Sequence, residues 1–380
     1  MAFKIYLSPP HMGGEEIKFV QEAFDTNWIA PAGPSLTRFE EEMAQYTGMA
    51  SALATSSGTS AIHLALRWFG VEKDDVVFCS DLTFAGSCNP ILYQLARPVF
   101  IDSEPDTWNM SPVALEKAFR WAEETGNMPK AVIIVDLYGE SADWDALLPI
   151  CRKYGVPVIE DSAEAAGSLY KGKHCGSFGD IAVFSFNGNK ILTTSGGGMV
   201  LSSNMMAVEK MRFWSTQARE PFIHYEHKEF GYNYRMSNVC AAIGRGQLRF
   251  LDRKVALRRS IHHRYQALLK DIPAEIKSHV QPASSNCWLN LLYIHTEDVT
   301  PSDVVIKLHN AEIEARPAWK PMHMQPVFAG CTSFSHYEDS YVDEDIFAHT
   351  VCLPSGDSMT DDQLALVIDE VKKCFINVSR

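Results

Sequence analysis

The segment AVIIVDLYGESADWDALLPICRKYGVPVIED, residues 131–161, carries the pattern that decides the fold. Two apolar runs without alternation, at residues 131–137 and 157–160, predict strands, and residues 144–154 between them predict a helix. Further strand-like runs and helix-like stretches occur at 59–69, 76–79, 98–101, 113–124, 181–186 and 199–201. Strands of this composition are buried on both faces, so we expect an α/β fold with a mostly parallel sheet covered by helices. In such sheets ligands bind beyond the carboxyl ends of the strands.

The remaining segments suggest how the chain is organised. Residues 15–24 and 39–46 each place apolar side chains at helical spacing, so we expect two helices that face the core. After about residue 245 the sequence changes to a charged helical stretch and shorter elements. We therefore expect a large domain over residues 1–245 and a smaller C-terminal α/β domain over residues 246–380.

Composition excludes several classes of protein. The chain has 34 Lys and Arg against 47 Asp and Glu, a formal net charge of −13, so general binding to nucleic acid or to anionic lipid is not expected. The apolar runs are far shorter than the roughly 18 residues of a membrane span. The first ten residues lack a signal pattern, and the nine cysteines are scattered, so we expect free thiols and a cytoplasmic protein.

A lysine follows the strand-like run at 181–186. The sequence there reads Asn187-Gly188-Asn189-Lys190. A lysine on a short loop directly after a buried strand lies where a ligand would bind, and its amine can act as a nucleophile toward carbonyl groups. A solvated surface lysine is the ordinary alternative, so this interpretation depends on the neighbouring motifs.

The first neighbouring motif is Glu160-Asp161-Ser162-Ala163-Glu164, at the end of the run at 157–160. A carboxylate at this edge of the sheet would project into the ligand crevice, where Asp161 could face a pyridinium nitrogen. A helix N-cap is the alternative for Asp161, and a carboxylate pair with Glu164 is another. No histidine lies nearby at the spacing of metal ligands, so we expect no metal there.

The second neighbouring motif is Ser57-Gly58-Thr59, directly before the helix predicted at 59–69. Small residues at a helix start leave backbone N–H groups free for an anion, which the helix dipole also favours. An ordinary Ser or Thr cap is the alternative. With Ser185 close to the lysine in sequence, a single phosphate becomes the expected ligand.

A lysine, an aspartate and a phosphate cradle are the three features that hold pyridoxal 5′-phosphate. At this point the sequence resembles the DegT/DnrJ/EryC1/StrS family of sugar-nucleotide aminotransferases over nearly its whole length. The resemblance rests on SPPHMGG at 8–14, on Asn187-Gly188-Asn189-Lys190, on STQARE at 215–220, on GYNYRMSN at 231–238 and on RPAWKPMH at 316–323. The family has the aspartate aminotransferase (type I) fold.

The resemblance implies residue roles around the cofactor. Lys190 would anchor pyridoxal phosphate through its amine, and Asp161 would pair with the ring nitrogen. Glu164 would lie beside the ring's phenolic oxygen, at a position where many relatives have Gln. The other implied contacts are Phe84 over the ring, Ser57, Gly58, Thr59 and Ser185 at the phosphate, and Asn233 from the neighbouring subunit of a homodimer with shared active sites.

The resemblance also implies the substrates. L-glutamate would donate its amino group to the C4 ketone of a UDP-4-keto-6-deoxy-N-acetylhexosamine, as in bacillosamine-type glycan biosynthesis. The implied sugar-nucleotide contacts are Asn27, Trp28, Ile29, Ala30, Arg316, Pro317, Ala318, Trp319 and Phe328. A guanidinium group suits a diphosphate and an aromatic ring suits a uracil. A surface cation stacked on an aromatic ring is the alternative for Arg316 and Trp319.

Other functions remain as alternatives. The same family acts on other keto sugars, such as those of the perosamine and pseudaminic acid pathways. Related dehydratases replace the lysine with histidine, and Lys190 is present here. A non-catalytic sugar-binding protein would not need the combination of Lys190, Asp161 and Ser185. A nicotinamide dehydrogenase would need a glycine fingerprint between strand and helix, which the Gly196-Gly197-Gly198 run does not provide.

No metal site is expected from the spacing of histidines. His224 and His227 have a His-x-x-His spacing, yet no cysteine or further histidine nearby in the sequence completes a tetrahedral set.

Overall fold

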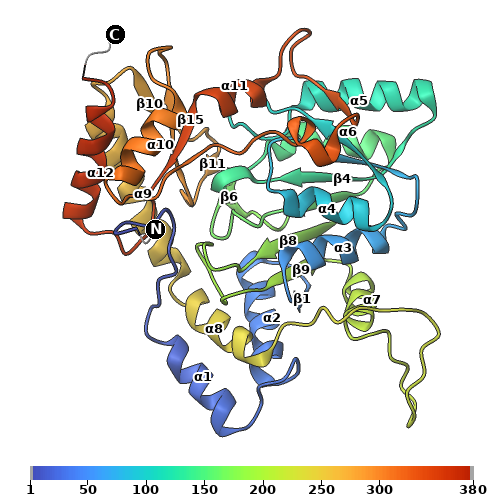
Figure 1. The fold of residues 1–380 in the computed structure, drawn as a ribbon. Coiled ribbons are helices and arrows are strands. Elements are labelled where there is room, and N and C mark those ends of the chain that lie inside the picture. Colours follow the sequence, from blue (N-terminus) through green and yellow to red (C-terminus); the bar gives the residue numbers. More distant parts are fainter. Residues whose placement is uncertain (1–2, 377–380) are drawn as a thin grey trace.

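The computed structural model describes residues 3–376 and is built around one large mixed sheet (Figure 1). Its eight strands lie in the order β1-β9-β8-β5-β4-β2-β3-β14. Strands β8 to β14 in that order are parallel, whereas β9 runs antiparallel to both of its neighbours. The bounds are β1 (Ser51–Thr55), β2 (Val76–Ser80), β3 (Arg97–Ile101), β4 (Pro129–Val135), β5 (Val158–Asp161), β8 (Ile181–Ser185), β9 (Gly198–Ser202) and β14 (Thr332–Phe334).

Helices cover both faces of this sheet, because alternate strand residues point to opposite sides. Val77 and Cys79 of β2 pack in one cluster with α3, α4 and α7, whereas Val76 and Phe78 pack on the other face with α5 and α6. These helices are α3 (Gly58–Trp68), α4 (Ala85–Tyr93), α5 (Pro112–Thr125), α6 (Trp144–Tyr154) and α7 (Met205–Ser215). The predicted parallel α/β core is therefore confirmed, with β1 as a strand that the sequence pattern did not reveal.

Local signals fix the ends of these helices. Ser111 caps α5 and Asp143 caps α6, each accepting a hydrogen bond from the backbone three residues on. Both helices end at a glycine in the left-handed conformation, Gly126 at φ 71° and Gly155 at φ 66°. The helices predicted at 113–124 and 144–154 consequently begin and end within one residue of the expected positions.

The C-terminal part of the chain forms a second layer around a four-stranded sheet, β10-β12-β15-β13. Its helices at 251–269, 301–310 and 361–373 pack around a separate apolar cluster that contains Leu292, Val351 and Val367. The elements are α8 (Asn238–Leu248), α9 (Leu251–Leu269), β10 (Ala274–Ile276), β12 (Asn290–Ile294), α10 (Pro301–Asn310), β13 (Arg316–Pro317), α11 (Val342–His349), β15 (Thr350–Leu353) and α12 (Asp361–Lys373).

Short elements connect these two parts. They are the small sheet of β6 (Leu169–Tyr170), β7 (Lys173–His174) and β11 (Ala283–Ser284), and the 3₁₀ turns η1 (Leu137–Gly139), η2 (Met322–Met324) and η3 (Pro326–Phe328). Besides β11 pairing with β6, further contacts cross the predicted division at residue 245. Strand β14 adds to the edge of the large sheet beside β3, and Ile5 forms a bridge with Ile313. The two-domain division stays a prediction.

The N-terminal helices differ from each other in burial. In α2 (Pro34–Thr47), Phe39 and Met43 are fully buried, as predicted. The prediction that α1 (Glu16–Asp25) faces the core is wrong, because Ile17 is 66% exposed and Phe24 is 60% exposed. Helix α1 packs on α8 through Glu16 and Ala23 instead, and its apolar stripe contacts no other part of the described chain closely enough to be buried.

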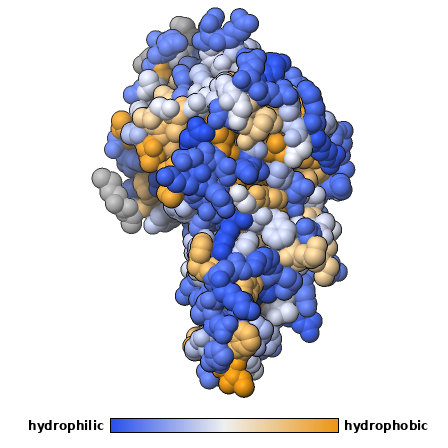
Figure 2. Space-filling view, turned by 90° about the vertical axis from the view of Figure 1, so that its right-hand side faces the viewer, coloured by the Kyte–Doolittle hydropathy of each residue, from blue (hydrophilic) through white to orange (hydrophobic). Residues whose placement is uncertain are grey.

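A long loop between α7 and α8 extends away from the body of the molecule (Figure 1). It exposes apolar side chains, among them Phe222, Ile223 and Phe230. Figure 2 shows apolar surface on the lower, protruding part of the molecule among hydrophilic side chains. Within residues 3–376 no helix has the length and apolar character needed to cross a membrane. None of the nine cysteines, all of which lie within residues 3–376, is joined in a disulfide.

Candidate active site

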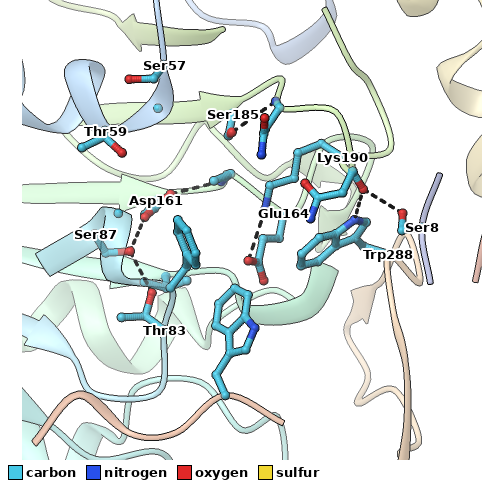
Figure 3. Close-up of a pocket in the computed structure, with 18 of the residues that line it drawn as sticks. Ser8, Ser57, Thr59, Thr83, Ser87, Asp161, Glu164, Ser185, Lys190 and Trp288 are labelled. Carbon is cyan, nitrogen blue, oxygen red and sulfur yellow. Dashed lines mark hydrogen bonds and ion pairs between the residues drawn. The ribbon is translucent and has the colours of Figure 1, made fainter. Parts of the chain in front are cut away.

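The carboxyl ends of the central parallel strands meet at one pocket of about 650 Å³ (Figure 3). Strand β5 ends at Asp161, β8 ends at Ser185, and the turn that follows β8 carries Lys190. The start of α3 lies across from Ser185. This is the edge at which the sequence pattern predicted a ligand.

Asp161 lies at the bottom of the pocket, and its side chain is held by hydrogen bonds. The Ser87 hydroxyl donates to Asp161 Oδ2 at 2.6 Å, and the backbone N–H of Ala163 donates to Oδ1 at 3.2 Å. The single O–H of Ser87 is used by Asp161, so the Thr83 hydroxyl, 2.7 Å away, must donate to Ser87. Burial raises the pKa of Asp161, and the bond from Ser87 opposes that rise.

Lys190 projects into the same pocket and pairs with Glu164. Its Nζ lies 3.3 Å from Glu164 Oε1 and 3.9 Å from the ring centre of Trp288, and its side chain is only 10% exposed. The other oxygen of Glu164 accepts a hydrogen bond from the backbone N–H of Tyr138 at 2.6 Å. Burial raises the pKa of Glu164 to about 7, and the charge of Lys190 opposes that rise. The amine is thus held over an aromatic face beside a carboxyl that can change its charge near neutral pH.

The turn that presents Lys190 is held from two sides. The carbonyl oxygen of Asn189 accepts hydrogen bonds from the Ser8 hydroxyl at 2.7 Å and from Trp288 Nε1 at 2.8 Å. Ser8 comes from the N-terminal segment and Trp288 from the C-terminal part. Distant segments of the chain therefore fix the direction of the lysine.

The beginning of α3 forms a cradle of small residues. Ser57 is the N-cap of α3 and accepts a hydrogen bond from the backbone N–H of Ser60 at 3.0 Å. A Cβ atom at Gly58 would lie 3.2 Å from Ser185 Cβ, and one at Gly198 would lie 2.4 Å from Gly58 N. The backbone contact requires glycine at Gly198 and leaves little room for a side chain at Gly58, and the first-turn N–H groups stay open toward the pocket.

Aromatic and basic side chains form the mouth of the pocket. The Trp319 ring lies 5.6 Å from the ring of Phe84 and 5.1 Å from that of Tyr138. Arg316 lines the pocket with a side chain that is 69% exposed, and its guanidinium lies 3.1 Å from Glu314. A cation and an aromatic surface are therefore available where a charged ligand would enter.

The structure brings most of the predicted residues to this one pocket. Those that line it are Ser57, Gly58, Thr59, Phe84, Asp161, Glu164, Ser185, Lys190, Arg316 and Trp319. The others lie elsewhere in the single chain, namely Asn27, Trp28, Ile29, Ala30, Asn233, Pro317, Ala318 and Phe328. Phe328 is buried because η3 turns its ring into the core against Phe100, and Ala318 is buried beside β15.

Residues that the sequence did not point to complete the site. Ser87 and Thr83 support Asp161, Tyr138 holds Glu164, and Trp288 covers Lys190. Tyr138 lies in η1, three residues after the end of β4, and has φ 53°, so its place close to a strand end was the one available signal. The others depend on contacts between distant segments, for which the sequence has no local pattern.

The family model for DegT/DnrJ/EryC1/StrS aminotransferases matches residues 10–372. The chain belongs to this aminotransferase family. EpsN of Bacillus subtilis (strain 168), whose name describes a pyridoxal phosphate-dependent aminotransferase, is 51% identical over 376 residues, which are 99% of this chain and 97% of EpsN. GDP-perosamine synthase of Caulobacter vibrioides is 35% identical over 97% of this chain and 98% of its own.

Solved structures of the DegT/DnrJ/EryC1/StrS family show the same fold. Helicobacter pylori PseC, an aminotransferase involved in the biosynthesis of pseudoaminic acid, superposes with a TM-score of 0.88 at 25% identity over 99% of both chains. The fold is therefore that of the type I pyridoxal phosphate-dependent transferases, as predicted.

Enzymes of this family work with pyridoxal phosphate, and the pocket fits that cofactor. It offers a buried carboxylate, Asp161, a partly desolvated amine, Lys190, and an open helix start at Gly58. These suit a ring nitrogen, an aldehyde carbon and a phosphate. When bound, pyridoxal phosphate supplies an electron sink for negative charge at the carbon next to the reacting nitrogen.

Proposed function

We propose that this aminotransferase moves the amino group of L-glutamate to the C4 ketone of UDP-2-acetamido-2,6-dideoxy-α-D-xylo-hexos-4-ulose. The products are UDP-4-amino-4,6-dideoxy-N-acetylglucosamine and 2-oxoglutarate, for bacillosamine-type glycan biosynthesis. The observation that carries the proposal is the convergence of Lys190, Glu164 and Asp161 in one pocket whose mouth holds Arg316 and Trp319. The names of relatives such as GDP-perosamine synthase support a nucleotide sugar as substrate.

Lys190 acts as the acid and base of the proposed reaction. Its Nζ takes a proton from the α-carbon of the donor and delivers one to C4 of the sugar, which requires an amine that can be both charged and neutral. Glu164, 3.3 Å away, orients Nζ and accepts its hydrogen bond. One amine on one side of the pocket gives the new amine a single configuration.

Asp161 acts as the counter-ion of the cofactor ring. Its burial makes the carboxylate costly to ionise alone, so a cationic ring nitrogen beside it is favoured. Ser87 and Ala163 hold the two carboxylate oxygens.

Arg316 and Trp319 receive the nucleotide in this proposal. The Arg316 guanidinium, held by Glu314, can donate two parallel hydrogen bonds to a diphosphate. The faces of Trp319 and Phe84 at the pocket mouth offer apolar surface for the base or sugar ring.

The substrate is tested with a panel of keto sugars. Purified enzyme with pyridoxal phosphate and L-glutamate is incubated with the UDP-keto sugar above and, separately, with GDP-4-keto-6-deoxymannose, the substrate expected of a perosamine-type enzyme. Mass and NMR analysis identify the amino sugar. The proposal predicts amination of the UDP sugar at C4, and amination of the GDP sugar alone contradicts it.

We further propose that the enzyme is a homodimer with shared active sites. Asn233 and the loop Asn27–Ala30 lie outside the pocket of their own chain and are exposed, as are apolar side chains of α1 and of the loop after α7. A second copy would cover these surfaces and bring Asn233 to the partner's phosphate cradle.

Hybrid dimers test this arrangement. Asn233→Ala chains should be inactive and so should Lys190→Ala chains, but a hybrid should contain one complete site. Random mixing should restore about a quarter of wild-type activity, because half of the dimers are hybrids with one working site of two. If mass spectrometry shows that hybrid dimers form but no activity is recovered, the result would contradict shared active sites.

A further inference from the structure

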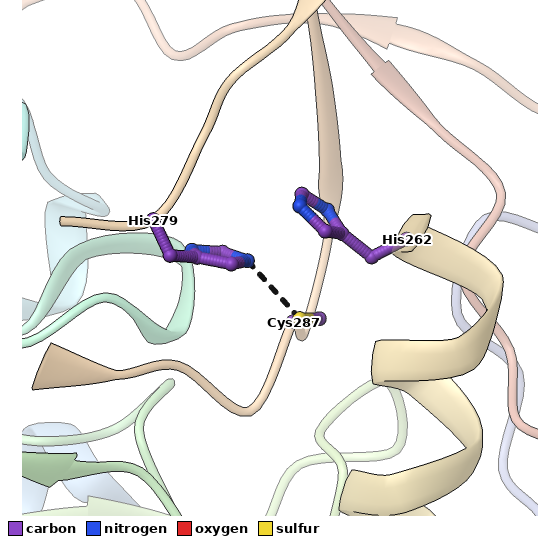
Figure 4. Close-up of side chains that lie close together, drawn as sticks. All are labelled: His262, His279 and Cys287. Carbon is purple, nitrogen blue, oxygen red and sulfur yellow. Dashed lines mark hydrogen bonds between the residues drawn. The ribbon is translucent and has the colours of Figure 1, made fainter. Parts of the chain in front are cut away.

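A second cluster of reactive side chains lies outside the pocket just described. His262 of α9, His279 between β10 and β11, and Cys287 between β11 and β12 approach one another (Figure 4). His279 Nε2 lies 3.1 Å from Cys287 Sγ, and one ligand atom of each residue lies within 4.8 Å of the others. Cys287 and His262 are almost completely buried.

The outer nitrogen of each ring is already held by another side chain. His262 Nδ1 lies 2.8 Å from Asn290 Oδ1, an acceptor, so Nδ1 must carry the proton and donate it. His279 Nδ1 lies 2.5 Å from Glu140 Oε2 and donates in the same way. His262 Nε2 is left with its lone pair, whereas His279 Nε2 shares a proton with Cys287 Sγ, and that proton must leave before a metal ion binds. This is the arrangement in which proteins hold metal-ligating histidines, because the second hydrogen bond fixes both ring orientation and tautomer.

The cluster also has room for a fourth ligand. A cavity of about 20 Å³ adjoins it, lined by His262, His279, Glu140 and Tyr138 among others. One water molecule needs roughly 10–15 Å³ of such space. A tetrahedral site with three protein ligands and one water can therefore form without rebuilding the backbone.

We propose that His262, His279 and Cys287 bind one zinc ion per chain, with water as the fourth ligand. Two imidazoles and one thiolate are a ligand set that zinc accepts in tetrahedral geometry. Bond lengths of about 2.0–2.1 Å to nitrogen and 2.3 Å to sulfur require ligand atoms roughly 3.3–3.6 Å apart, so side-chain shifts of about 1 Å suffice. The ion displaces the proton between Cys287 and His279, which is released to solvent.

The Cys287 thiolate and the Glu140 carboxylate behind His279 carry one negative charge each and offset the two positive charges of zinc, with the Lys277 amine at the edge of the adjoining cavity. Cys287 also adopts φ 53°, a conformation that few residues other than glycine adopt and that a functional contact can stabilise. The ligands come from three separate segments, which is why histidine spacing in the sequence gave no sign of them.

The position of the site indicates what the ion does. It joins α9 and the segments around β11 to Glu140, which follows η1 in the large sheet layer. Cys287 is also the direct neighbour of Trp288, the residue that covers Lys190. The zinc ion would hold these segments together and stabilise the wall of the active site.

Metal content of the holoenzyme tests the proposal. Protein purified from zinc-supplemented cells and dialysed against metal-free buffer should contain about one zinc per chain. Cys287→Ser and His279→Gln should lose it, whereas the matched controls Cys240→Ser and His263→Gln, a half-buried thiol and an exposed neighbour on α9, should keep it. Glu140→Gln should weaken zinc binding by roughly 10–100-fold, as expected when a hydrogen bond to a ligand is lost.

Cobalt gives a measurement on the unaltered chain, which does not depend on whether variants fold. After zinc is removed with a chelator, cobalt should produce thiolate charge-transfer absorption and the visible bands of a tetrahedral ion, and the thermal unfolding midpoint should rise when either metal is restored. Wild-type enzyme with neither zinc nor a cobalt spectrum would overturn the proposal. Retention of zinc in both Cys287→Ser and His279→Gln would also overturn the proposal. A site that binds copper in preference to zinc, with intense thiolate absorption, would overturn it too.

Discussion

Removal of the Ser87 hydroxyl should weaken cofactor binding without disturbing the fold. In Ser87→Ala, Asp161 Oδ2 loses the hydrogen bond that it accepts at 2.6 Å, and only the longer bond from the backbone N–H of Ala163, at 3.2 Å, remains on the other oxygen. A hydrogen bond to a charged group is worth about 1.5–3 kcal/mol. The dissociation constant of pyridoxal phosphate should therefore rise roughly 10- to 100-fold, since 1.4 kcal/mol corresponds to a factor of ten.

The pH dependence gives this prediction a second readout. Burial raises the pKa of Asp161 and the Ser87 bond lowers it, so the variant should hold the proton of Asp161 up to a higher pH than the wild type. Protonated Asp161 cannot serve as counter-ion to the ring. The loss of affinity in Ser87→Ala should consequently grow as the pH falls.

Titration with pyridoxal phosphate, followed by absorbance between about pH 6 and pH 9, measures both effects. Thr83→Val is the matched control, because Thr83 contacts Ser87 and is one bond further from Asp161. It removes a bond between neutral groups, worth about 0.5–1.5 kcal/mol, and should cost less affinity than Ser87→Ala. An unchanged dissociation constant in Ser87→Ala, or a larger loss in Thr83→Val, would refute the assignment of Asp161 as counter-ion.

Three further predictions concern stability and pH. Burial raises the pKa of Glu164 from 4.5 to about 7, so the native chain holds this proton more tightly than the unfolded chain. The free energy of unfolding of the cofactor-free wild type should therefore fall by up to about 3 kcal/mol from pH 4.5 to pH 7, relative to that of Glu164→Gln. Denaturant unfolding at a series of pH values measures this difference. Glu40→Ala should lower the free energy of unfolding by about 3–5 kcal/mol, because it leaves the largely buried Arg235 without its carboxylate partner. An equal decrease in Met205→Ala, at an exposed position, would contradict this reason. Phe39→Ala should also lower the free energy of unfolding by about 3–5 kcal/mol, since the fully buried Phe39 ring packs with its centre 5.2 Å from that of Phe186. A decrease below about 1 kcal/mol would show that neighbouring side chains fill the space left by the ring.

The sequence predicted the sheet and its helices because those elements have strong local patterns. The runs that became β2, β4, β5 and β8 are mostly apolar and do not alternate, and helices such as α6 carry both a cap and a terminal glycine. Strand β1 was missed since its sequence, SALAT, is short and only weakly apolar. Pairing between such segments then placed Asp161 and Ser185 at one edge.

Other features could not be predicted, because they depend on contacts between distant parts of the chain or between chains. The apolar side chains of α1 look like a core stripe, yet Ile17 and Phe24 are exposed in the single chain. Phe328 is an aromatic residue of the kind expected to contact the sugar nucleotide, but its ring packs on Phe100 in the core. Trp288 reaches Lys190 from almost a hundred positions along the chain, and no local signal marks that contact.

The central claim is that Lys190 is the amine to which pyridoxal phosphate binds in this pocket. Borohydride reduction of the holoenzyme fixes the bond between cofactor and lysine, and peptide mass spectrometry then identifies the modified residue. We predict that the phosphopyridoxyl group lies on Lys190 in wild-type enzyme and is absent from every peptide of Lys190→Ala. Modification of a different lysine in the wild type, with Lys190 unmodified, would contradict this account.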